Sequence, residues 1–394
     1  MAELDTSGSG AVLSTMYRNE FEPDVRMLTK KKSIFQQRNW FGKGSNSPIV
    51  ICDNFKGGEK AGTRIVVDFA KPVNQLPVSG ATTINGTAAP ITHYQSYIDL
   101  HQHRLLLRSE GRMDEQHRIH KLRKEWVPQF GQYGASLIDA LMIRACYTGA
   151  TTITSELLAS GEILGTLANN WTDGWQSGVY TSAHRVVYGG TATSFASIAQ
   201  GDVFNVTTAR RLAAGCRQAG RGTINIDGYE IVGVCILSPG QVYTLKDDAR
   251  WSEAQLLMPQ NTSNPFFTGA LFNIDGVMFY PDLRNPDAIG VFADSSKGSR
   301  GSLLFHSMAD PSYDKVEAIC LSAQALAYAP HTESAIDPYE ITEGNEFPGD
   351  IWRTMIGFGK IQYNRGTDSS ATVVDVGVTY VATAAPNNLA AIGA

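Results

Sequence analysis

The stretch MDEQHRIHKLRKEWVPQFGQYGASLIDALMIRACYT, from Met113 to Thr148, decides the fold. Its apolar residues recur at spacings of three and four, the period of one face of an α-helix. They are Ile119, Leu122, Trp126, Phe130, Tyr133, Leu137 and Leu141. A helix over the whole stretch would be roughly 50 Å long at ~1.5 Å per residue. Pro128 removes one backbone hydrogen bond and crowds the preceding turn, so we expect a kink there and no break. We therefore predict a long spine helix, charged toward its N-terminus and buried toward its C-terminus.

The composition narrows the class of protein. Hydrophobic residues make up 43% of the 394 residues and charged residues only 18%, which suits a surface largely covered by partners. The net charge of -5 argues against nucleic-acid binding over the whole surface. Five scattered cysteines without a C-x-x-C pair favour reduced thiols in a cytosol-like compartment. The longest apolar run is too short to span a membrane, and the start MAELDTSGSG lacks a signal pattern.

Two alternating segments precede the helix. Arg64–Lys71 and Thr92–Leu100 alternate between polar and apolar residues, so we predict two strands. A long loop rich in Pro, Gly, Ala and Thr, Pro72–Pro90, joins them. A loop of that length inside a compact domain is usually functional, and a lone pair of strands is marginally stable in water. We therefore expect this extended loop to lie on another copy of the chain.

Residues 1 to about 52 show no sustained periodicity. They combine polar residues with isolated aromatic residues, which are Tyr17, Phe21, Phe35, Trp40 and Phe41. We interpret this segment as an arm that cannot fold alone but carries anchors for binding along a surface. The run Lys30–Lys32 is more typical of a solvated face than of a nucleic-acid contact.

The segment after the spine predicts a compact α/β domain. Residues 149–200 suggest loops and short strands, after which Asp202 would cap a helix that ends at Ala219. Tyr229–Leu237 predicts one buried strand, and Ser238-Pro239 would open a helical region that continues to Met258. Phe266–Tyr280 predicts a hairpin around Asp275-Gly276.

The remaining residues predict a return of strands to the spine. Residues 292–302 form a Ser- and Gly-rich loop, and Thr332–Asp350 forms an acidic one. Strand-like segments lie between and after them, at Val316–Tyr328, Arg353–Asn364 and Thr372–Tyr380. With the spine these strands would form the last domain, so the α/β domain would be an insertion.

Catalytic motifs are missing from the sequence. The stretch Gly57–Thr63 has the glycine spacing of a phosphate-binding loop, but no lysine follows Gly62 to bind the terminal phosphates. The best metal candidates are the pairs His101 and His103, and His117 and His120, without Cys or carboxylate ligands at suitable spacing. We predict that the protein is not an enzyme and needs no cofactor. A metal-dependent enzyme is a weak alternative, which metal analysis of the purified protein would test.

Charged residues around the start of the spine helix are candidates for contacts between subunits. Basic residues from Arg104 to Lys124 alternate with Glu110, Asp114, Glu115 and Glu125, which favours ion pairs between subunits over the tracking of DNA phosphates. The candidates for inter-subunit contact, including those on the two strands, are Arg64, Asp68, Lys71, His93, Asp99, Arg108, Arg112, Arg118, Lys121, Arg123 and Lys124.

The order of these parts resembles a known fold, that of the major capsid proteins of tailed double-stranded-DNA phages, shared with encapsulins. Local segments are similar to the major capsid family of short-tailed phages of the coliphage N-four type. These segments are GEKAGTRIVVDFAKPV, LRSEGRMDEQHRIHKLRKE, SPGQVYTLKDDARWSEAQ, FFTGALFNIDGVMFYPD and VEAICLSAQALAYA, and they occur in the right order from Gly58 onward.

The resemblance implies an α+β architecture with named parts. Residues 1–52 would be the N-terminal arm, 53–110 the extended loop, and 111–200 the peripheral domain with the spine helix. Residues 201–300 would be an inserted axial domain, and 301–394 the return to the peripheral domain.

The resemblance also implies a function. The protein would assemble as hexamers and pentamers into an icosahedral shell around phage double-stranded DNA, which it would contact weakly and without sequence preference. Scaffolding, portal and decoration proteins would be partners, no membrane would be involved, and assembly would take place in the host cytoplasm. Crosslinking through Lys56, Lys60 or Lys71 is not expected, since no activating acid is visible nearby. The alternatives are a tail-tube or portal protein and an encapsulin-like compartment.

Overall fold

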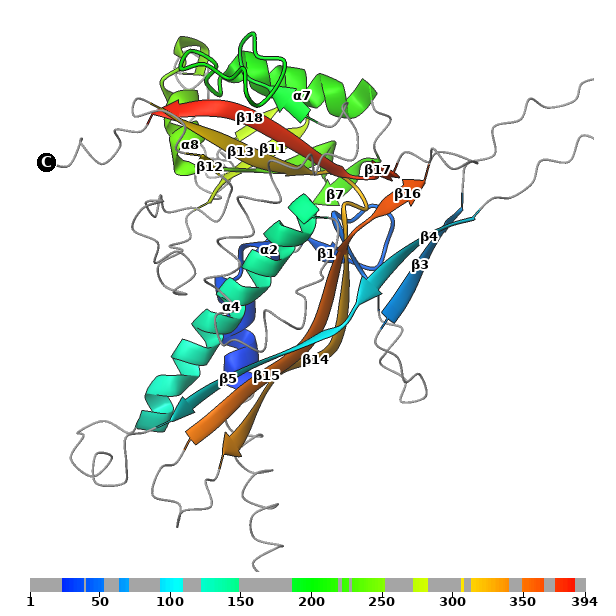
Figure 1. The fold of residues 1–394 in the computed structure, drawn as a ribbon, viewed down its shortest axis with the longest axis vertical. Coiled ribbons are helices and arrows are strands. Elements are labelled where there is room, and N and C mark those ends of the chain that lie inside the picture. The colour runs from blue at the N-terminus through cyan, green and yellow to red at the C-terminus, as the bar shows by residue number, and fades with distance from the viewer. Residues whose placement is uncertain are drawn as a thin grey trace, which may run out of the picture.

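A computed structural model shows two lobes, one above the other in Figure 1, joined by a long helix and crossing strands. The structure describes residues 23–38, 40–52, 64–70, 93–108, 122–148, 186–218, 222–226, 229–251, 272–282, 306–307, 313–339, 349–364 and 373–386. Each lobe is built on its own sheet, with helices packed against it (Figure 1).

The lower lobe contains a five-stranded sheet of order β1-β2-β14-β15-β5. Its strands are β1 (Phe41–Gly42), β2 (Ile49–Ile51), β14 (Leu326–Tyr339), β15 (Gly349–Lys360) and β5 (His101–Arg108). The pairs β14·β15 and β15·β5 are antiparallel, whereas β1·β2 and β14·β2 are parallel. β14 extends to Tyr339, so residues 332–339 form strand where the sequence predicts part of an acidic loop. Pairing with β15 outweighs the low strand propensity of these acidic residues.

The spine helix covers one face of this sheet. Helix α4 (Leu122–Thr148) is 27 residues long and continues through Pro128 without a break, as the sequence predicts. The start of the predicted helix, residues 113–121, lies outside the described residues. From Ala135 onward almost every described side chain of α4 is buried, and the ring centroids of Tyr133 and Trp352 are 5.6 Å apart. The predicted burial of the C-terminal half of the spine is therefore confirmed.

An N-terminal segment packs against the spine within the same subunit. Residues 23–32 are helical, and the short helix α2 (Ile34–Gln37) follows. Val25, Phe35 and Trp40 are fully buried. Asp139 of α4 holds the start of α2, because its carboxylate accepts hydrogen bonds from Ser33 Oγ (2.6 Å) and Ile34 N (3.1 Å). The sequence does not predict these helices. Phe35, Trp40 and Phe41 lie on the subunit's own core, whereas Tyr17 and Phe21 are outside the described residues.

The upper lobe contains a seven-stranded mixed sheet of order β10-β11-β9-β13-β18-β6, with β12 paired to β13. Its strands are β10 (Phe272–Ile274), β11 (Val277–Pro281), β9 (Gly233–Leu237), β13 (Tyr313–Leu321), β18 (Val378–Pro386), β6 (Val186–Tyr188) and β12 (His306–Ser307). The sequence predicts that the α/β domain ends near residue 300. In the structure its sheet also contains β13 and β18, which come later in the chain. Pairing of β13 with β9 and β18 joins residues far apart in the chain.

In the upper lobe, most predictions from local sequence patterns agree with the structure. Asp275 and Gly276 have positive φ angles of 50° and 87°, as the predicted hairpin turn between β10 and β11 requires. Helix α8 (Pro239–Lys246) starts with a capping box on Ser238 and Gln241 and ends at Lys246. Residues 249–251 are helical again, and residues 252–258 of the predicted helical region lie outside the described residues. The predicted strand Tyr229–Leu237 is divided into β8 (Tyr229–Ile231) and β9, and β8 pairs with β7 (Ile224–Ile226).

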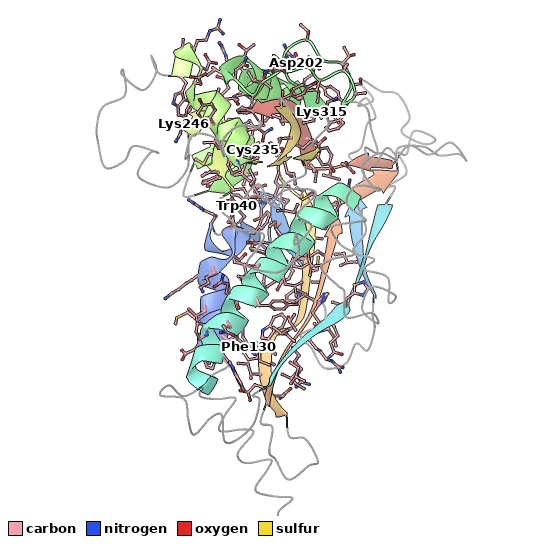
Figure 2. All side chains as sticks on the ribbon, turned by 60° about the vertical axis from the view of Figure 1, so that its left-hand side comes forward. Trp40, Phe130, Asp202, Cys235, Lys246 and Lys315 are labelled. Atoms are coloured by element: carbon pink, nitrogen blue, oxygen red, sulfur yellow. The ribbon has the colours of Figure 1, made fainter. Side chains whose placement is uncertain are left out.

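The predicted cap at Asp202 is wrong. Helix α7 (Val206–Gln218) starts four residues later, and the Asn205 side chain accepts the hydrogen bond of Thr208 N at 2.9 Å. The Asp202 carboxylate instead accepts hydrogen bonds from Thr191 N and Ala199 N, which closes the loop between β6 and α7. Figure 2 shows Asp202 and Lys315 together near this loop, with Trp40 between the two lobes.

Candidate assembly surface

A two-stranded ribbon projects beside the lower lobe. Strands β3 (Arg64–Ala70) and β4 (His93–Asp99) are antiparallel, as the sequence predicts, and β3 pairs with no other strand among the described residues. Both views show this ribbon along one side of the molecule (Figures 1 and 2). β4 leads through Leu100 into β5, so the ribbon continues an edge of the lower sheet.

The backbone register brings predicted contact residues together on this ribbon. Arg64 lies directly opposite Asp99, and Asp68 lies opposite Gln95. His93 is opposite Ala70, at the end from which the connecting loop leaves. Direct partners on an antiparallel pair share a face, so one face carries both a basic and an acidic position.

The edge strand β5 has one face toward the spine and one face away from it. Trp352 of β15 packs on α4, and its direct partner Leu105 therefore faces the spine as well. Side chains alternate along a strand, so the next pair, Arg104 and Arg353, faces outward. We call the outward positions Gln102, Arg104, Leu106, Ile351, Arg353 and Met355 the outer face of the lower sheet.

The outer face combines exposed apolar surface with positive charge. Leu106 is 43% exposed and lies opposite Ile351. Arg104 lies opposite Arg353, although like charges directly across a ladder are unfavourable. Asp337 offsets part of this charge, because its Oδ2 lies 2.7 Å from Arg353 Nε. Arg104 Nη2 donates to Gln102 Oε1. A surface of this kind suits a partner with apolar and acidic groups.

The face of β5 toward the spine contains two histidines, His101 and His103. His103 is 4% exposed. Burial, with a smaller effect of the charge on His101, lowers the pKa of His103 to about 4. Its ring is therefore neutral at pH 7, and it lies opposite Thr354.

Only part of the predicted basic cluster before the spine helix lies within the described residues. Arg108 is opposite Gly349 at the end of β5, and Arg123 and Lys124 belong to the first turn of α4. Lys71, Arg112, Arg118 and Lys121 lie outside the described residues. The sequence does not single out Leu106, Arg353 or Asp337 as contact residues. The strand register that aligns them could not be read from local patterns.

In the described part of the chain, no group of three or more His, Cys, Asp or Glu residues is placed to hold a metal ion. None of the described helices is long and apolar enough to cross a membrane.

The family of the chain follows from a match over nearly its whole length. Residues 7–387 match the family described as phage capsid protein. The chain belongs to this family. No curated protein matches it.

Solved phage capsids have a similar fold. The capsid of Ralstonia phage GP4 has a TM-score of 0.64 at 22% identity, covering 91% of this chain and 92% of that chain. The capsid of cyanophage Pam1 has a TM-score of 0.63 at 14% identity, with 91% and 93% covered. The acid-stable capsid of Helicobacter pylori bacteriophage KHP30 has a TM-score of 0.59 at 13% identity, with 89% and 91% covered.

These findings confirm the main predictions from the sequence. The phage capsid protein is a structural major capsid protein of a tailed phage, with the α+β capsid fold, and it is not an enzyme. It associates with copies of itself in the capsid of the virion. The similarity to the coliphage N-four type stays a prediction.

Proposed function

We propose that this capsid protein forms hexamers and pentamers that close into an icosahedral shell around double-stranded phage DNA. The observation that supports this proposal best is the ribbon of β3 and β4, which pairs with no third strand in the described part of the chain. Two strands alone are marginally stable in water and leave edge groups unpaired. Ile98 of β4 is buried against Ala327, Ala329 and Ile361 of the same subunit, and a neighbouring subunit supplies the surface that the rest of the ribbon needs.

The parts of the chain then have distinct roles in the shell. Residues 1–52 act as the N-terminal arm, whose described part, from residue 23, packs within its own subunit, and residues 53–110 act as the extended loop. Residues 111–200 and 301–394 form the peripheral domain, while 201–300 form most of the axial domain around the hexamer and pentamer centres. Since β6, β12, β13 and β18 belong to the upper sheet, we assign these four strands to the axial domain and not to the peripheral one.

The outer face of the lower sheet is the second contact in this scheme, and a second copy of the chain covers it. Its exposed Leu106 supplies apolar area, and the excess positive charge of Arg104 and Arg353 selects an acidic surface. The chain as a whole has a net charge of -5, so acidic surface is abundant on neighbouring copies. This face continues directly from the ribbon through Leu100. The predicted contact residues Arg64, Asp68, Lys71, His93 and Asp99 belong to the ribbon side of the same interface, and Arg108, Arg112, Arg118, Lys121, Arg123 and Lys124 to the segment that follows it.

The packaged DNA makes weak and non-specific contacts with the shell. A net charge of -5 gives no strong overall attraction to phosphates, so counterions screen the wall and DNA is able to leave. Scaffolding, portal and possibly decoration proteins complete the particle, and assembly takes place in the host cytoplasm.

Expression of the protein alone, followed by sedimentation and electron microscopy, tests this function. We expect capsomers, closed shells or tubes with a curved lattice of hexamers. Only monomers at micromolar concentration in all buffers would contradict the proposal. Isolated rings without a lattice would favour a tail-tube or portal role, and a shell that copurifies with a cargo enzyme would favour an encapsulin-like compartment.

A further inference from the structure

A buried ion pair lies where the two lobes meet. Lys360 is the last residue of β15 in the lower sheet, and Asp375 ends β17 (Val373–Asp375), which leads into the upper sheet. Lys360 Nζ lies 3.1 Å from both carboxylate oxygens of Asp375, and both side chains are completely buried.

Tyr380 connects this pair to the upper sheet and to the spine helix. Its hydroxyl, from β18, accepts a hydrogen bond from Lys360 Nζ at 3.2 Å and donates one to the carbonyl oxygen of Cys146. Cys146 is in the last turn of α4, where carbonyl groups have no donor within the helix. The positive ammonium group also lies on the side of the helix end that carries partial negative charge. We call Lys360, Asp375, Tyr380 and the Cys146 carbonyl the junction network.

The junction network lies where the chain crosses repeatedly between the lobes. The connection from β13 to β14 runs through Ser322 and Ala325, and Gly377 connects β17 to β18. These crossings are bound to one another: Ser322 N donates to Gly377 O at 2.8 Å, and Ile361 N donates to Ala325 O at 3.1 Å. A Cβ atom on Gly377 would lie 2.6 Å from Ala323 O, so the crossings are in very close contact. Movement of one lobe relative to the other would therefore have to displace these crossing segments.

The chemistry of the junction network suits a role in orienting the two lobes better than a role in stabilising the fold. Burying both charges costs desolvation energy that their attraction only partly recovers, and a well-packed hydrophobic pair is often equally stable or more so. An ammonium group bonded to a carboxylate and a hydroxyl nevertheless imposes directions that apolar side chains do not impose.

We infer that the junction network fixes the angle between the two lobes, and thereby the curvature of the shell. The second half of this inference rests on the proposed function. Each subunit contacts its neighbours through both lobes, so the angle between the lobes sets the angle between neighbouring subunits. That angle decides whether the lattice closes into a shell and how large the shell is.

The first experiment measures the angle in unassembled subunits. Spin labels on cysteines introduced at exposed positions of the two lobes, Q129C on α4 and A214C on α7, in a C52S background, report the distance between the lobes. We expect one narrow distance distribution for the parent. The variant Y380F, and the double variant K360M/D375L, should broaden or shift it.

A matched control is available in the upper lobe. Lys315 is also a buried lysine, but its Nζ donates to the carbonyl oxygens of Phe195 (3.2 Å) and Ala196 (2.9 Å) within that lobe alone. The variant K315M should therefore leave the distance distribution unchanged. Y380F removes a single hydroxyl group and keeps the inference testable if the double variant does not fold.

The second experiment examines shells made from the same variants by electron microscopy. We expect Y380F and K360M/D375L to give a wider range of diameters or open sheets, and K315M to give parental shells. Distance distributions and shell diameters equal to those of the parent in Y380F or the double variant would overturn the inference. If the parent itself forms no shells, the proposed function fails, but the distance measurement still decides the role of the network.

Discussion

His103 makes the subunit sensitive to acid at a single residue. Its pKa in the folded protein is lowered to about 4 by burial, whereas an unfolded histidine has its ordinary value of 6.5. Between these values the unfolded chain binds more protons than the folded one, so acidification favours unfolding. The stabilising contribution is complete above about pH 6.5 and is lost progressively as the pH falls toward 4.

The prediction concerns the variant H103L in unassembled subunits. For the parent, the two pKa values imply a loss of about 2 kcal/mol in the free energy of unfolding between pH 7 and pH 5 from this residue. The free energy of unfolding of H103L should therefore fall by about 2 kcal/mol less than that of the parent between pH 7 and pH 5. Urea unfolding at both pH values measures the difference. Equal pH dependence in the two proteins would show that His103 is accessible to protons in the folded subunit.

At the scale of elements, close packing explains the glycines of the spine. A Cβ atom added to Gly131 would lie 2.7 Å from Leu28 Cβ, and one on Gly134 would lie 3.0 Å from a ring carbon of Trp352. These glycines therefore let the helical residues 23–32 and strand β15 approach α4. In the sequence they look like interruptions of the helix pattern, because the segment that contacts them is remote in the chain.

The variant G131A tests this packing. Alanine has the higher helix propensity by about 1 kcal/mol, but the clash with Leu28 would push helix 23–32 away at a cost of about 1–3 kcal/mol. We expect G131A to lower the urea midpoint of unfolding. In the control variant G215A, in α7, no atom outside the neighbouring backbone of the same helix lies within 4 Å of the new Cβ, so helix propensity should raise the midpoint. A raised midpoint in G131A would contradict the close approach.

The elements that the sequence predicts well are those with local causes. The apolar period defines α4, the Asp275-Gly276 turn defines the hairpin of β10 and β11, and Ser238-Pro239 defines the start of α8. Elements whose formation depends on residues distant in the chain are not predicted by local patterns. Residues 332–339 are acidic but pair with β15, and the helix at 23–32 has too short an apolar pattern to be recognised without its partner α4.

The candidate assembly surface could be predicted only in part. Alternation identifies the ribbon strands, because it is a property of each strand alone. The outer face needs the register of Arg104 against Arg353, which is set by pairing between residues that are distant in the chain. The same reason hides the junction network, whose members come from α4, β15, β17 and β18.

At the scale of the whole molecule, the proposed role of the ribbon predicts the effect of a deletion. Removal of Val73–Pro90 should leave a folded and soluble subunit, because β3 pairs only with β4 among the described strands. Closed shells should be lost, since the segment that reaches the neighbour is absent. Circular dichroism and urea unfolding would measure the fold, and electron microscopy the yield of shells.

The control for this deletion replaces the same residues by a Gly-Ser segment of equal length. If length alone matters, this variant should still form shells. If side chains of the loop make the contact, it should fail in the same way as the deletion. Unchanged shell yield after the deletion itself would refute the role given to the ribbon.

The strand order also limits when the protein is able to fold during its synthesis. Strands β14 and β15 lie between β2 and β5 in the lower sheet, and β13 and β18 are central in the upper one. All four come from residues 313–386, so neither sheet is complete before the ribosome has translated these late segments. Chains that end before these strands lack the interior of both sheets and leave apolar surface exposed. The strand order thus keeps an incomplete chain from reaching the folded state in which it could join a particle.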